Sequence, residues 1–144
     1  MKKHLFALIL ALGVGLGVNV DQTHAQTSLT IRVEIPFAFT ANRKILPAGT
    51  YRITPVSDNR TVWRIHGEDS GEFISVNSLA AAERSGDLRV TFHRYGKKHF
   101  LAGFTTPLYE VDLPASRAEK TLLAAGHTLA TTDVAVNNME TTSH

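Results

Sequence analysis

The sequence predicts a mainly β protein, built as an antiparallel β-barrel or β-sandwich of about six to seven strands with one short C-terminal α-helix. Three observations support this prediction. Apolar and polar residues alternate over short segments, which is the period of a half-buried strand. Turn-forming residues separate these segments at short intervals, as in sandwiches and small barrels. One segment near the C-terminus instead carries apolar residues at helical spacing.

The composition fits one compact domain. Of the 144 residues, 43% are hydrophobic and 19% are charged, which is enough apolar material for a core and argues against wholesale disorder. The absence of cysteine excludes disulfides, thiolate metal sites and a cysteine nucleophile. A net charge of +2 is too small to indicate nucleic acid as a partner.

Residues 1–25 are predicted to be a signal peptide that is removed on export. Lys2 and Lys3 give a positively charged start, an apolar run follows, and Ala25 offers a small residue for cleavage before Gln26. The apolar run is shorter than the roughly 20 residues of a spanning helix, and it contains glycines. We therefore expect an exported protein, periplasmic or extracellular, with no membrane span after cleavage.

The first part of the domain contains four predicted strands. The first covers residues 29–40, where every second residue is apolar: Ile31, Val33, Ile35, Phe37 and Phe39. Pro36 interrupts the polar face and cannot donate a ladder hydrogen bond, so it marks an edge or a bulge. Polar or glycine-containing turns then separate strands predicted over residues 50–55, 61–66 and 72–78. Trp63, Tyr51, Phe37 and Phe39 are interpreted as core or core-rim residues.

The clearest predicted hairpin joins residues 88–95 to residues 98–106 through Gly96-Lys97. Glycine at the first central position suits a type II′ turn, which gives a two-residue connection. The segment before this hairpin, residues 79–87, is interpreted either as one helical turn or as a loop.

A short helix is predicted over residues 116–125. Ser116 and Glu119 have the spacing of a capping box, and Gly126 is placed to end the helix. Three apolar residues recur at helical spacing and are expected to pack over an open end of the sheet: Ala118, Leu122 and Ala125.

These elements make a single β-rich domain over residues 26–126. Residues 127–144 are rich in Thr, Asn and Ala, and we interpret them as a polar, flexible tail. Within that tail, residues 128–136 could instead add a final strand.

The hairpin also holds the densest mixture of cationic and aromatic residues in the chain. We consider it a candidate surface-binding strip for an anion or a polymer, made of His93, Arg94, Tyr95, Lys97, Lys98 and His99. The alternative, which we favour, is an ordinary hairpin tip whose aromatic pairs stabilise it and whose lysines block edge pairing.

Catalytic and metal-binding motifs are weak. His93 and His99 face opposite sides of a hairpin with a two-residue turn, and no third ligand is suitably spaced, so we expect no metal or cofactor. Asp69-Ser70-Gly71 matches the aspartic-protease signature, but only once and on a predicted solvated turn. Serine-hydrolase motifs and phosphate-binding glycine loops are absent beyond the signal peptide. No catalytic residue is predicted.

Three blocks together resemble a group of small exported bacterial proteins of uncharacterised function. They are IPFAF at 35–39 with LPAGTYRI at 46–53, FHRYG at 92–96 with the following FL at 100–101, and LPASRAE at 113–119. The resemblance implies a signal peptide, one β-rich domain and a C-terminal helix. It implies no known activity, cofactor or catalytic residue.

The protein is therefore expected to be a non-enzymatic binding or structural module that acts through a surface or a partner, and a cell-envelope component is one candidate partner. One alternative is a carrier that holds a small apolar ligand inside a β-barrel. A third hypothesis is a hydrolase that uses Asp69 or His93.

Overall fold

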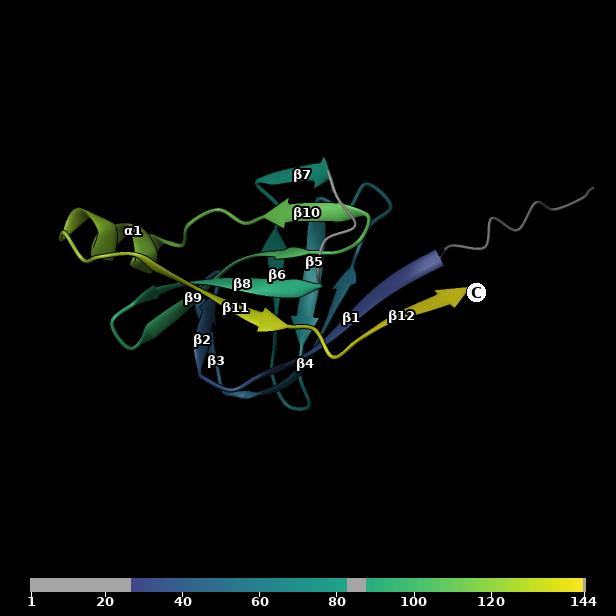
Figure 1. Ribbon diagram of the computed structural model, residues 1–144, viewed down its shortest axis with the longest axis horizontal. Coiled ribbons are helices and arrows are strands. Elements are labelled where there is room, and N and C mark those ends of the chain that lie inside the picture. The colour runs from purple at the N-terminus through teal and green to yellow at the C-terminus, as the bar shows by residue number, and fades with distance from the viewer. Residues whose placement is uncertain (1–26, 83–87, 144) are drawn as a thin grey trace, which may run out of the picture.

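Two β-sheets pack against each other in the computed structural model, which describes residues 27–82 and 88–143 (Figure 1). The described residues form twelve strands and one short helix, so the mainly β class is confirmed and the arrangement is a sandwich. The predicted signal peptide, residues 1–25, lies outside the described residues. Gln26, the residue expected to follow the cleavage site, also lies outside them.

The first sheet has five strands, all antiparallel, in the order β12-β1-β4-β5-β6. They are β1 (Thr27–Ile35), β4 (Gly49–Pro55), β5 (Val62–His66), β6 (Gly71–Ser75) and β12 (Asn138–Ser143).

The second sheet has seven strands, and its main path runs β11-β8-β9-β10-β7. A short hairpin of β2 and β3 joins it through a parallel contact between Thr40 of β2 and Phe100 of β9. The strands are β2 (Phe39–Ala41), β3 (Lys44–Leu46), β7 (Ser78–Ala81), β8 (Arg89–Tyr95), β9 (Lys98–Thr105), β10 (Tyr109–Asp112) and β11 (Ala130–Ala135).

The predicted count of six to seven strands is wrong, and Pro36 gives one reason. β1 ends at Ile35 in the first sheet, and β2 begins at Phe39 in the second. Proline has no backbone N–H, so the ladder stops there and the chain crosses between sheets. The segment predicted as a helical turn or loop over residues 79–87 begins instead with β7, and residues 83–87 lie outside the described part of the chain.

The flexible tail predicted over residues 127–144 is also wrong for most of its length. β11 pairs with β8 at the edge of the seven-stranded sheet, and β12 pairs with β1 at the edge of the other. β11 lies within residues 128–136, the segment for which a strand was the alternative. Its polar and β-branched residues alternate between exposed and half-buried positions, which suits an edge strand.

The core lies between the sheets and is filled by aromatic and branched side chains. Trp63 of the first sheet meets Phe104 of the second edge to face, with ring centroids 4.8 Å apart. Phe39 contacts Tyr51 and Phe92 at centroid distances of 5.2 and 5.3 Å. All five side chains are buried, so the core interpretation is confirmed for Trp63, Tyr51 and Phe39, and Phe37 is partly buried at the rim of this core.

The β8–β9 hairpin has the predicted two-residue turn. Gly96 has a φ of +60°, as the first central residue of a type II′ turn requires. His93 lies opposite Phe100 and Arg94 lies opposite His99, so the two histidines do project from opposite faces. Farther along β9, the register shifts between Thr91 and Phe92 of its partner strand, which is a β-bulge.

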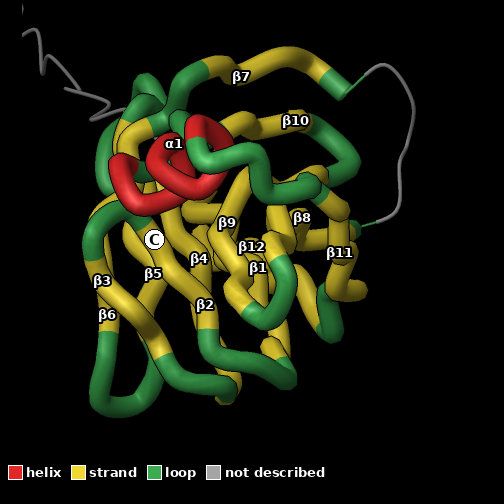
Figure 2. The backbone as a smooth tube through the Cα atoms, turned by 90° about the vertical axis from the view of Figure 1, so that its left-hand side faces the viewer, coloured by secondary structure: helices red, strands yellow, loops and turns green. Residues whose placement is uncertain are grey.

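The helix α1 (Arg117–Ala124) lies across one end of the sandwich (Figure 2). Ser116 is its N-cap, as expected, but the predicted apolar face is wrong. Glu119 is the buried residue of the helix, whereas Ala118 and Ala125 are exposed and Leu122 is half-buried. Among the described residues, no helix has the length and apolar character needed to span a membrane.

Candidate binding site

The candidate strip of the β8–β9 hairpin is divided between its two faces. His93 and Tyr95 project toward α1, and Arg94 and His99 project from the opposite face. The two lysines at the tip are exposed. The six side chains therefore do not form one continuous surface.

His99 is used in packing. Its imidazole stacks on Phe37, with ring centroids 3.9 Å apart and an angle of 16° between the planes. Burial and the neighbouring positive charge of Arg94 lower the pKa of His99. Its Nδ1 is buried without a hydrogen-bond partner among the described residues. These features describe a neutral ring that contributes to the core edge.

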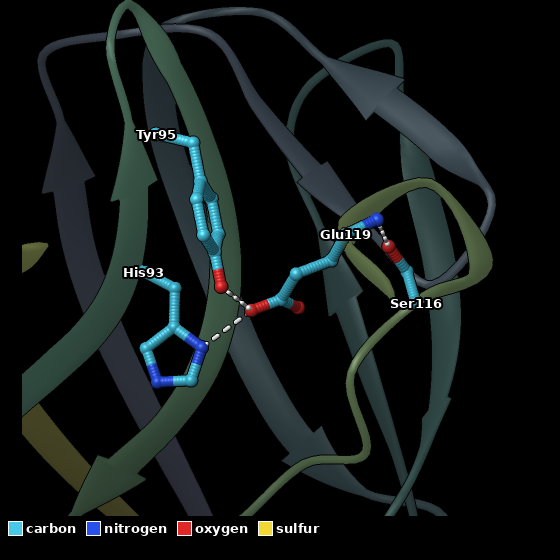
Figure 3. A network of polar contacts seen from close by, with 4 residues as sticks. All are labelled: His93, Tyr95, Ser116 and Glu119. Atoms are coloured by element: carbon cyan, nitrogen blue, oxygen red, sulfur yellow. Dashed lines mark hydrogen bonds and ion pairs between the residues drawn. The ribbon is translucent and has the colours of Figure 1, made fainter. Parts of the chain in front are cut away.

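The other face of the hairpin forms a polar cluster with α1 (Figure 3). One carboxylate oxygen of Glu119 lies 2.6 Å from Nδ1 of His93 and accepts a hydrogen bond of 3.1 Å from the Tyr95 hydroxyl. Glu119 is only 2% exposed and Tyr95 only 3%, so this polar contact is shielded from water.

The contacts of Glu119 with the hairpin explain why the capping box forms only in part. The Ser116 hydroxyl accepts a hydrogen bond of 3.1 Å from the backbone N–H of Glu119. In a full capping box the glutamate side chain would return to the N-cap N–H, but here it reaches the hairpin. The sequence interpretation missed the role of Glu119 in this cluster, because its spacing from Ser116 already had a local explanation.

A carboxylate beside an imidazole resembles part of a catalytic triad, and among the described residues His93 makes a side-chain hydrogen bond only through Nδ1, to Glu119. The contact joins α1 to the hairpin. Burial raises the pKa of Tyr95, and the negative charge of Glu119 raises it further.

We therefore expect stability to fall in alkaline solution through Tyr95. Because its pKa in the folded protein lies above the ordinary value of 10.0, the stabilisation is complete below that pH and is lost as the pH rises above it. Urea unfolding at increasing pH should show this loss, and Tyr95→Phe should make it smaller. Tyr109→Phe is the control, because Tyr109 is half-buried and its hydroxyl makes no hydrogen bond to a carboxylate among the described residues. Equal alkaline losses in Tyr95→Phe and the parent protein would contradict the assignment.

A second candidate site is a groove on the outer face of the five-stranded sheet. Strand pairing places Arg32 of β1 opposite Arg52 of β4, and Arg52 opposite His66 of β5. These three side chains form a row across adjacent strands and line a groove of about 740 Å³. Its rims are the loop at 47–49 and the turn at 67–70.

Tyr51 holds the two rims together. Its hydroxyl donates a hydrogen bond of 2.6 Å to the carbonyl oxygen of Pro47, and the Ser70 hydroxyl lies 3.4 Å from it. A Cβ atom at Gly67 would lie 3.0 Å from the Tyr51 ring, so glycine permits the turn to approach the ring closely. The Tyr51 side chain therefore connects the two rims of the groove.

The groove is cationic along the row and acidic at one rim. Within the described residues, the one ion pair joins His93 to Glu119, so neither Arg32 nor Arg52 is paired with a carboxylate. Asp69, the residue of the protease-like signature, is exposed on the rim beside Glu68. A carboxyl group in that setting lacks the burial and the partner carboxylate that tune an aspartic protease.

A smaller groove of about 430 Å³ lies on the outer face of the seven-stranded sheet and has a different character. Two of its carboxylates already accept hydrogen bonds: Asp133 from Thr91 at 2.8 Å and Asp112 from Ser78 at 2.9 Å. Across the described chain, no group of three or more His, Asp or Glu side chains could hold a metal ion. This groove has one arginine, Arg89, beside its carboxylates, whereas the first groove has two arginines and a histidine in a row.

No family model, curated protein or solved structure matches this chain. The side chains described above are therefore the basis for a functional assignment.

Proposed function

We propose that this chain is an exported, non-enzymatic binding module whose ligand is an anion held in the groove on the outer face of the five-stranded sheet. The observation that carries the proposal is the row of Arg32, Arg52 and His66, which lines a groove and has no carboxylate partner among the described residues.

The repulsion between the two arginines supports a ligand. Like charges directly opposite each other on neighbouring strands destabilise a sheet, and here both positions carry a guanidinium. A bound anion would remove that repulsion, and guanidinium groups are well suited to bind carboxylate, phosphate or sulfate oxygens through paired hydrogen bonds. Within the part of the chain that the structure describes, the exposed rim carboxylates Glu68 and Asp69 form no ion pair with the row of cations.

The packing between the sheets supports an exterior site over an interior one. Trp63, Phe104 and their aromatic neighbours occupy the space in which a carrier would hold an apolar ligand. The export expected from the N-terminal sequence would place the groove outside the cytoplasm, where it could act on a cell-envelope partner.

We expect Arg52→Gln to weaken anion binding by at least about tenfold, which corresponds to about 1.4 kcal/mol. Arg52 is the middle residue of the row and contacts both neighbouring strands, so its loss removes the charge from the centre of the groove. Isothermal titration calorimetry with sulfate, phosphate and acetate, each exchanged against chloride at constant ionic strength, measures the affinity.

Arg94→Gln is the matched control, because it removes the same charge from an exposed position on the other sheet. It should leave affinity unchanged. If none of the three anions binds saturably, or if both variants weaken binding equally, the proposal is wrong.

A further inference from the structure

His66 occupies the end of the cationic row, where charged groups approach it from several elements. Opposite it on β6 is Gly71, which brings no charge, and the next residue, Glu72, accepts a hydrogen bond of 3.4 Å from Asn42. The charged groups on the other bordering elements are Arg32 and Glu34 of β1, Lys44 of β3, Arg52 of β4, Arg64 of β5, and Glu68 and Asp69 of the turn.

The imidazole of His66 has hydrogen-bonding capacity left over. Its Nδ1 is buried and has no partner among the described residues, although the side chain lines an open groove. Burial lowers the pKa of His66, and the positive charges of Arg64 and Arg52 lower it further. The burial and the cationic neighbours therefore outweigh the two rim carboxylates, and the free protein holds a neutral ring at neutral pH.

We propose that the groove binds a dianionic oxyanion of the sulfate or phosphate type together with one proton, which His66 takes up from solvent when the anion enters. The inference rests on the proposed anion-binding function and adds the ligand class and its regulation. Affinity is then higher in acidic solution. By thermodynamic linkage, the anion favours the charged imidazole by the same free energy as the charged imidazole favours the anion.

The number of donors favours a tetrahedral anion over a single carboxylate. One guanidinium can occupy both oxygens of a carboxylate by itself. Here two guanidiniums and an imidazole project from three adjacent strands, which are spaced about 4.8 Å apart. A tetrahedral anion has an oxygen for each of these donors, and its two negative charges offset the repulsion that three neighbouring cations would otherwise create.

Sulfate is the probe for the test, since its own charge stays constant over the pH range in which histidine titrates. Calorimetry between about pH 5.5 and pH 7.5 should show roughly tenfold tighter sulfate binding at the acidic end. Titrations in buffers of different ionisation enthalpy should show proton uptake that approaches one per sulfate bound. Acetate should bind more weakly than sulfate throughout.

Two histidine variants identify the group that takes up the proton. His66→Gln should still bind sulfate, but with little pH dependence and no proton uptake. His99→Gln is the matched control, because His99 also has a buried, unpartnered Nδ1 but lies on the other sheet. It should behave like the parent protein. If His66→Gln does not fold, an NMR titration of the parent protein replaces it, and sulfate should raise the pKa of His66 but not that of His99.

The outcomes separate this inference from the proposed function. Sulfate binding that is lost in Arg52→Gln but is independent of pH in the parent protein would overturn the proton coupling and leave anion binding intact. Proton uptake that persists in His66→Gln would also overturn it. Acetate binding as tight as sulfate binding would overturn the ligand class. Absence of saturable binding by any of the anions would overturn both proposals.

Discussion

Replacement of Gly103 by alanine is expected to lower the free energy of unfolding by about 3 kcal/mol. Gly103 is buried in β9, where the backbone of β10 passes close to it. A Cβ atom added at this position would overlap the carbonyl oxygen of Val111 and would lie 3.5 Å from Cα of Asp112. A backbone carbonyl held in a ladder cannot rotate aside, so the two strands would have to separate.

Gly126→Ala provides the comparison for this prediction. No atom lies within 4 Å of a Cβ added at Gly126, but its φ of +79° is unfavourable for alanine. The cost there should be about 1 kcal/mol and should come from the backbone conformation alone. Urea unfolding followed by fluorescence of Trp63, the one tryptophan of the chain, measures both variants. Similar decreases in the free energy of unfolding for the two variants would show that the close approach of the β10 backbone to Gly103 does not determine the cost.

Local sequence patterns predicted the elements well where each strand carries its own signal. Ile31, Val33 and Ile35 alternate with polar residues, and all three are buried on the inner face of β1. Gly96 likewise indicated a two-residue turn, which sets the pairing of β8 with β9 from the turn as far as the β-bulge beside Phe92. In these cases the relevant interactions are close in sequence.

Pairing between distant segments could not be read from the same patterns. Arg32, Arg52 and His66 each belong to a predicted strand, but their alignment depends on how β1, β4 and β5 pair. A shift of one residue would move these side chains to the other face of the sheet. β12 is similar, because its partner β1 lies at the opposite end of the chain. The sequence therefore could not predict the groove lined by these three residues, because it does not give the strand order.

The helix shows how one local signal can conceal a long-range one. The spacing of Ser116 and Glu119 correctly predicted the start of α1, and the Ser116 half of the box is present. The carboxylate of Glu119, however, makes its contacts with residues 24 and 26 positions earlier in the chain. Those contacts, together with the exposure of Ala118 and Ala125, indicate that α1 is attached by a buried polar group and not by an apolar face.

Glu119→Ala is accordingly expected to lower the free energy of unfolding by about 3 kcal/mol, and to release α1 from the hairpin. The truncation leaves the Tyr95 hydroxyl buried without its acceptor and removes the charge that faces His93. Relative to the parent protein, hydrogen exchange should accelerate more in α1 than in the central strands of both sheets. Urea unfolding should measure the decrease in the free energy of unfolding. Lys120→Ala, one residue away on the exposed side of the helix, should cost no more than about 0.5 kcal/mol.

A double-mutant cycle with Tyr95→Phe tests whether the loss comes from this polar contact. Tyr95→Phe alone should cost about 1 kcal/mol, because it removes one hydrogen bond to a carboxylate that keeps His93 as a partner. Once Glu119 is alanine, the Tyr95 hydroxyl has lost that acceptor, so removing the hydroxyl should cost nothing or restore stability. The double variant should therefore be more stable than the sum of the single losses by roughly 1 kcal/mol or more. Strictly additive losses would mean that α1 is held by packing around Glu119, and that the carboxylate does not join the helix to the hairpin.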